Sequence, residues 1–214
     1  MKSLIGLLTT LLILIAAVFA IEFLPKLKKP KMIQIEDSKG GLDMVIKNYG
    51  KDIDSCADLF GIKPEFLKSL TMLECSGKKI FEERFEPHVY AKLKKVKFGQ
   101  LKQYEHVTPE MLIDANDEAL KNLASSWGPF QLMGYKCLLL GIKIKDIRGE
   151  NAVYYGVKWI DMTYGNYLKK NKFKDAFHIH NAGRPYPIIG GPFTHDPSYC
   201  DRGLKYMDYF KRNN

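Results

Sequence analysis

LKSLTMLECSG, residues 67–77, places a carboxylic acid within an apolar repeat. If these residues form a helix, Leu67, Leu70 and Glu74 fall at i, i+3 and i+7 and share one face. Burial on such a face penalises the charged form of Glu74 and favours the protonated acid, which is the form that general-acid chemistry needs. Gly77 is expected to end this helix beside loops, where a cleft can form. The alternative is a solvated glutamate that pairs with one of the many lysines.

The composition describes a basic globular protein. The chain has 214 residues, of which 46% are hydrophobic and 12% aromatic, enough for one domain with a packed core. Its net charge of +9 is unchanged without residues 1–22, because these contain one lysine and one glutamate. Such an excess favours a polyanionic partner: a nucleic acid, an anionic membrane surface or an acidic cell-wall polymer.

The N-terminus predicts export. Residues 4–21 form an uncharged run that is just long enough to span a bilayer, and residues 18–20 also resemble a signal-peptide cleavage site. Four lysines within residues 26–31 complicate the anchor, because the positive-inside rule would keep them in the cytoplasm. We expect residues 1–22 to be a signal peptide or membrane anchor and residues 23–41 to be a linker. The domain would then be periplasmic or would face the cell wall, which disfavours a nucleic-acid partner, and no nucleic-acid motif occurs.

The cysteines leave two interpretations open. Cys56, Cys75, Cys137 and Cys200 show no CxxC spacing that would indicate a zinc site or a redox motif. They could form two disulfides in an oxidising compartment, or they could be four buried thiols.

The apolar periodicity predicts a mainly α fold. The segment 151–169 is expected to be the longest helix and the centre of a helical bundle. A charged, aromatic stretch allows at most a small β-hairpin near residues 80–100, and Thr108 and Pro109 mark a helix start. The other predicted helices cover 42–48, 52–60, 64–76, 117–124, 174–180 and 199–210, and a further apolar helix is expected to follow Gln131 and to end at about residue 140.

Two further segments contain candidate site residues. Among the acidic residues of the charged stretch, Glu86 is the best candidate for a second catalytic carboxylate, because Phe85 and Pro87 flank it. Glu82 and Glu83 are expected to be solvated. The segment SSWGPFQLMG, residues 125–134, combines stacking and hydrogen-bonding groups that suit a sugar, or alternatively forms a helix-start loop with a core tryptophan. Its candidate sugar-binding residues are Ser126, Trp127, Gly128, Gln131 and Met133.

Three segments in order resemble the lysozyme-like superfamily of lytic transglycosylases and goose-type lysozymes. They are Glu74-Cys75-Ser76-Gly77, the Gly128-x-x-Gln131 segment and His180-Asn181-Ala182-Gly183. In that superfamily a Glu-Ser, a Gly-x-x-Gln and an Asn-Ala-Gly element line one cleft. The segment RFEPHVY, residues 84–90, together with SWG at 126–128, is also similar to phage-type N-acetylmuramidases.

The resemblance covers about residues 50–184 and implies an α+β lysozyme-like catalytic domain over 42–214 that acts on peptidoglycan glycan strands without a cofactor or metal. Glu74 would protonate the glycosidic oxygen between N-acetylmuramic acid and N-acetylglucosamine. Gln131 and the backbone near Gly128 and Met133 would hold the sugar.

The same resemblance implies that Asn181 orients Glu74 or the substrate. The chain departs from the pattern twice, with Cys75 where a serine is usual and His180 where a tyrosine is common. Both departures bear on how Glu74 is positioned.

Several functions remain open at this stage. Glu74 acting alone would make a lytic transglycosylase, whereas a second carboxylate such as Glu86 would make a hydrolase, which the RFEPHV segment favours. A zinc peptidase using some of the histidines lacks a recognised ligand spacing. A non-catalytic peptidoglycan-binding or envelope-assembly protein would need only the basic surface and the anchor.

Overall fold

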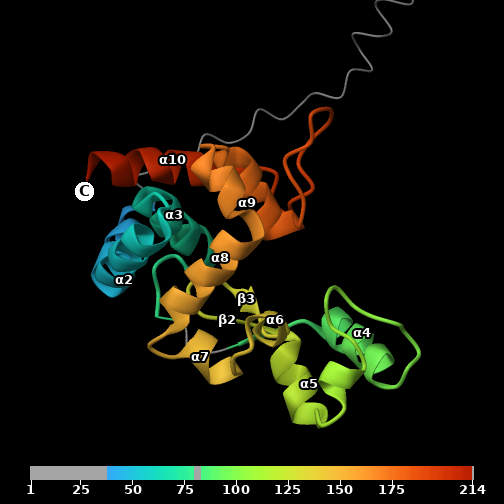
Figure 1. Cartoon of the computed structure of the whole chain (residues 1–214). Helices are drawn as coiled ribbons and strands as arrows, with labels where there is room; N and C mark the ends of the chain where they lie inside the picture. Colours follow the sequence, from blue (N-terminus) through green and yellow to red (C-terminus); the bar gives the residue numbers. More distant parts are fainter. Residues whose placement is uncertain (1–37, 80–82, 214) are drawn as a thin grey trace, which may run out of the picture. The chain divides into compact units, whose positions relative to one another are not determined.

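The computed structural model describes residues 38–79 and 83–213, which lie in one compact unit (Figure 1). The unit is mainly helical with one small antiparallel sheet, which confirms the predicted fold class. The predicted leader, most of the linker and Glu82 lie outside the described residues. Within the described part, no helix is both long and apolar enough to cross a membrane.

The helices and strands follow one another in an order that matches most of the predicted elements. The helices are α2 Lys39–Phe60, α3 Pro64–Cys75, α4 Pro87–Lys97, η2 Glu110–Leu112, α5 Asp117–Leu123, α6 Lys136–Leu140, α7 Ile144–Arg148, α8 Ala152–Lys169, α9 Phe173–Ala182 and α10 Tyr199–Arg212; the strands are β1 Arg84–Phe85, β2 Ser125–Trp127 and β3 Leu132–Met133.

α2 is a single helix where two were predicted. A helix-interior glycine costs roughly 1 kcal/mol relative to alanine, yet α2 continues through Gly50 because Leu42, Val45 and Ile53 stay fully buried on both sides of it. α2 begins at Lys39, within the predicted linker, and its 22 residues exceed the 18 of α8, which was predicted to be the longest helix.

α3 begins at Pro64 as predicted, but its left-handed cap is Ser76, with φ of 52°, rather than Gly77. Gly77 follows with φ of 70°, and a Cβ there would lie 2.4 Å from the backbone nitrogen of Val45. A glycine is therefore required where the loop after α3 presses against α2.

The sheet has the order β1-β2-β3, and its hairpin joins β2 to β3 rather than lying near residues 80–100 as predicted. β1 pairs with β2 from a distant part of the chain, and Pro87 then starts α4. Strands of two or three residues are too short to show alternation, so their position was not readable from periodicity.

α8 occupies the centre of the helical part and packs against α2, α7 and α9 (Figure 1). The main core forms where α3, α8 and α9 meet, around Leu70, Ile160 and Phe177. The ring of Phe130, in the β2–β3 turn, lies directly against Gly156 of α8, where a Cβ would come within 2.4 Å of it. This contact fixes the hairpin turn to the central helix.

We expect Gly156→Ala to lower the free energy of unfolding by about 1–3 kcal/mol, because the added methyl group overlaps the Phe130 ring. The matched control is Gly40→Ala in α2, where nothing lies within 4 Å and alanine should be neutral or stabilising. Urea denaturation of both variants measures the difference. Equal stability of the two variants would contradict the packing role of Gly156.

Candidate active site

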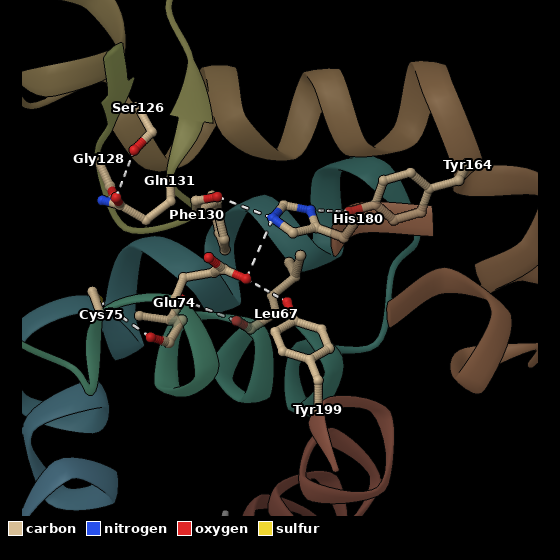
Figure 2. Close-up of polar contacts among 11 residues, drawn as sticks. Leu67, Glu74, Cys75, Ser126, Gly128, Phe130, Gln131, Tyr164, His180 and Tyr199 are labelled. Atoms are coloured by element: carbon tan, nitrogen blue, oxygen red, sulfur yellow. Dashed lines mark hydrogen bonds and ion pairs between the residues drawn. The ribbon is translucent and has the colours of Figure 1, made fainter. Parts of the chain in front are cut away.

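Glu74 lies in the last turn of α3, on the helix face where Leu67 and Leu70 are fully buried. Its side chain is 16% exposed, so the carboxylate is largely removed from water without being sealed off. This placement agrees with the apolar-stripe prediction. The group is surrounded by residues from three other parts of the chain (Figure 2).

One oxygen of Glu74 is held by two neighbours. The Tyr199 hydroxyl, at the start of α10, donates a hydrogen bond to Oε1, and His180 Nε2 lies 3.8 Å from the same atom (Figure 2). Among the described residues Oε2 has no hydrogen-bond partner. Glu74 therefore has one oxygen that is fixed and one that remains available for a proton.

His180 is a neutral donor in this arrangement. Its Nε2 lies 3.0 Å from the carbonyl oxygen of Phe130, which can only accept, so this nitrogen carries the hydrogen. Its Nδ1 lies 2.7 Å from the Tyr164 hydroxyl, which can then donate to it. Burial lowers the pKa of His180, and the nearby charge of Glu74 opposes this shift only in part. The neighbour of Glu74 is thus an uncharged imidazole.

The two tyrosines are permanent donors. Burial and the charge of Glu74 raise the pKa of both Tyr164 and Tyr199 well above the usual value, so both keep their hydroxyl protons. Tyr164 has a non-helical backbone, with φ of −140°, at a kink inside α8. The kink lies at the residue whose hydroxyl holds His180.

The β2–β3 turn is held by its own side chains. Ser126 Oγ donates to Gln131 Oε1 at 2.8 Å, and Gln131 Nε2 donates to the carbonyl oxygen of Gly128 at 3.1 Å. Gln131 has a φ of 47°, which is unfavourable for a residue with a side chain and marks a constrained position. A Cβ on Gly128 would lie 2.5 Å from the carbonyl oxygen of Ile147, so only glycine fits there.

A pocket of about 500 Å³ lies beside this turn. Gln131 and Asn181, which the sequence placed in two separate motifs, both line it, and so does His180, which touches Glu74. Two of the three motifs therefore line the pocket, whereas Glu74 is not among the lining residues and lies behind His180. The lining consists of Glu105, Gln131, Leu132, Met133, Tyr135, Lys136, Trp159, Thr163, Ile179, His180, Asn181, Ala182 and Gly183.

Some predicted site residues lie elsewhere. Trp127 is 3% exposed, and its indole nitrogen donates to the carbonyl oxygen of Asn122, so its ring belongs to the core and does not line the pocket. Ser126 is buried and acts through Gln131. Glu86 precedes α4 and pairs with Arg84 at 3.1 Å and His88 at 3.6 Å, again outside the pocket lining.

Asn181 is exposed on the pocket wall, but within the described chain it makes no hydrogen bond to Glu74. The residues that lie at Glu74 are Tyr199 and His180, so an orienting role of Asn181 could concern only the substrate. Tyr199 and Tyr164 were missed in the sequence, because each was assigned to an amphipathic helix face. The available signal was a tyrosine hydroxyl on an apolar face, which needs a buried partner.

The cysteines are all buried free thiols, so the disulfide option is not realised. Cys75 donates from Sγ to the carbonyl oxygen of Thr71 at 3.2 Å, and burial raises its pKa to about 11. It thus takes the place of the expected serine as an inert, hydrogen-bonded side chain. In residues 38–79 and 83–213 no cluster of three or more histidine, cysteine or acidic side chains could hold a metal ion.

Comparisons of the chain with family models, with curated proteins and with solved structures find no match. The lysozyme-like resemblance therefore rests on the motifs within the chain. The function is argued below from the geometry around Glu74.

Acidification should destabilise the protein through His180. Its folded-state pKa lies below the ordinary value of 6.5, so the unfolded chain takes up a proton first, and stability falls as the pH drops from about 6.5 toward the folded-state pKa. We expect His180→Gln to lose less stability than the wild type between pH 7.5 and pH 5.5 in urea denaturation. Identical losses would show that His180 is not a buried neutral group.

Proposed function

We propose that the protein is a peptidoglycan-cleaving glycosidase, a muramidase that acts on the bond between N-acetylmuramic acid and N-acetylglucosamine. The observation that carries the proposal is the position of Glu74. One of its oxygens accepts a hydrogen bond from Tyr199 and lies 3.8 Å from His180, which lines the same pocket as Gln131 and Asn181. The net charge of +9 suits an anionic cell-wall polymer, and the apolar run at residues 4–21 suits export to it.

In the proposed reaction, Glu74 donates the proton on Oε2 to the glycosidic oxygen as the bond to the muramic acid C1 breaks. The leaving sugar departs as an alcohol, and Glu74 becomes a carboxylate. Tyr199 donates a hydrogen bond to Oε1 and so stabilises the negative charge as it develops, whereas the Nε2–H of the nearby His180 is directed to the Phe130 carbonyl oxygen. A general acid placed in this way contributes roughly 10²–10⁴-fold in rate.

The fate of the muramic acid cation separates two enzymes. In a hydrolase, water attacks C1 with help from a second carboxylate. Glu86 was the candidate, but it pairs with Arg84 and His88 and lies outside the pocket lining. That placement favours a second candidate function, a lytic transglycosylase, in which the substrate's own hydroxyl attacks C1 and Glu74 takes up its proton.

Glu74→Gln should lower the rate of glycan cleavage at least 100-fold with little loss of stability, because the amide keeps the shape and lacks the acidic proton. Mass spectrometry of fragments released from purified peptidoglycan checks this and identifies the reaction. Reducing-end muramic acid indicates hydrolysis, and anhydro-muramic acid indicates a transglycosylase. Binding without fragments from the wild-type chain would contradict both and support a non-catalytic binding protein.

Tyr199→Phe should lower kcat about tenfold or more, because hydrogen bonds to charged groups contribute roughly 1.5–3 kcal/mol. Without this donor the Glu74 carboxylate is less stabilised, so the basic limb of the rate profile should move to higher pH. Tyr209→Phe, on the same helix, is the matched control and should leave the rate unchanged. A lower rate with an unmoved pH profile would assign Tyr199 a purely structural role.

A further inference from the structure

The pocket wall across from the β2–β3 turn holds a cation. Lys136, the first residue of α6, lines the pocket, and its side chain is only 16% exposed. Its Nζ lies 4.7 Å from the centre of the Tyr135 ring and 5.5 Å from that of Trp159. The aliphatic part of this lysine is therefore packed, and its ammonium group is fixed between aromatic rings.

The hydrogen-bonding capacity of the Lys136 ammonium group is only partly used. It carries three donors, yet among the described residues its hydrogen-bond partner is Glu105, at a long 3.5 Å. The Glu105 side chain is half exposed, and exposed ion pairs are weak. Trp159 adds a buried indole N–H that has no acceptor within the described part of the chain. Two donors among the lining residues, Lys136 Nζ and Trp159 Nε1, thus lack a good acceptor within the described residues.

Glu105 itself is held in an unfavourable backbone conformation. Tyr104 and Val107 pair across a tight turn, and Glu105 within it has a φ of 55°. A residue with a side chain adopts this conformation only where its surroundings impose it. The turn keeps the Glu105 carboxylate 3.5 Å from the Lys136 ammonium group.

We propose that Lys136 binds a carboxylate carried by the muramic acid of the glycan, and that Glu105 is the internal carboxylate which this ligand displaces. The inference rests on the proposed function and adds a substrate preference to it. Muramic acid offers such a group either as its own lactyl carboxylate or as a carboxylate of an attached stem peptide. N-acetylglucosamine offers none, so Lys136 would select peptidoglycan over chitin-like glycans.

Ligand binding to the full-length chain carrying Glu74→Gln tests this by titration calorimetry. Three tetrasaccharides serve as probes: a peptide-free muramic acid glycan, the same glycan with stem peptides, and neutral chitotetraose. Adding Lys136→Met, which keeps a packed aliphatic side chain, should weaken the affinity for a muramic acid glycan about tenfold. The affinity for chitotetraose should change less than about twofold. A loss of affinity for the peptide-free glycan identifies the lactyl carboxylate as the group that Lys136 binds. A loss of affinity for the peptide-bearing glycan alone identifies a carboxylate of the stem peptide.

Two further variants sharpen the test. Lys92→Met removes a lysine over the Tyr104 ring, outside the pocket lining, and should change none of the three affinities. Glu105→Gln should tighten binding of the muramic acid glycan severalfold, because the competing carboxylate is gone. Equal weakening of all three ligands by Lys136→Met would overturn the Lys136 inference and leave the proposed function intact. Failure of all three ligands to bind the parent chain would overturn the proposed function and this inference with it.

Discussion

The placement of a carboxylate on a buried helix face is the constraint on which the site depends. Removing Glu74 from water has a cost unless donors replace the lost hydration. α3 cannot supply them, because its own donors are used within the helix. The donor comes instead from α10, through Tyr199, so the packing of this helix against α3 positions the carboxylate.

The hairpin turn and the acid are linked through one residue. The ring of Phe130 is pressed against Gly156 of α8, and its carbonyl oxygen accepts the hydrogen of His180 Nε2. The same turn contains Gly128 and Gln131, whose mutual hydrogen bond sets its shape. A displacement of this turn would therefore move the hydrogen-bond acceptor of the imidazole beside Glu74.

The sequence predicted the elements more reliably than the contacts. Pro64 and the apolar stripe placed Glu74 correctly, because helix periodicity is a local property. The short strands had no periodicity to read, and Gly50 suggested a break that burial on both sides of it overrides. Trp127 was a candidate for stacking on a sugar, but whether an aromatic ring faces a pocket or the core depends on tertiary packing. Tyr199 could not be assigned to Glu74 because 125 positions separate them.

The histidine at position 180 stands where the resemblance commonly has a tyrosine. Its Nε2–H is directed to the Phe130 carbonyl oxygen, and the ring is neutral because its other nitrogen accepts a hydrogen bond. Tyr164 supplies that bond from the kink in α8, and burial lowers the imidazole pKa. A charged imidazole 3.8 Å from Oε1 would add an ion pair to Glu74, whereas the neutral ring leaves the Tyr199 hydroxyl as the hydrogen-bond donor to this carboxyl group within the described residues.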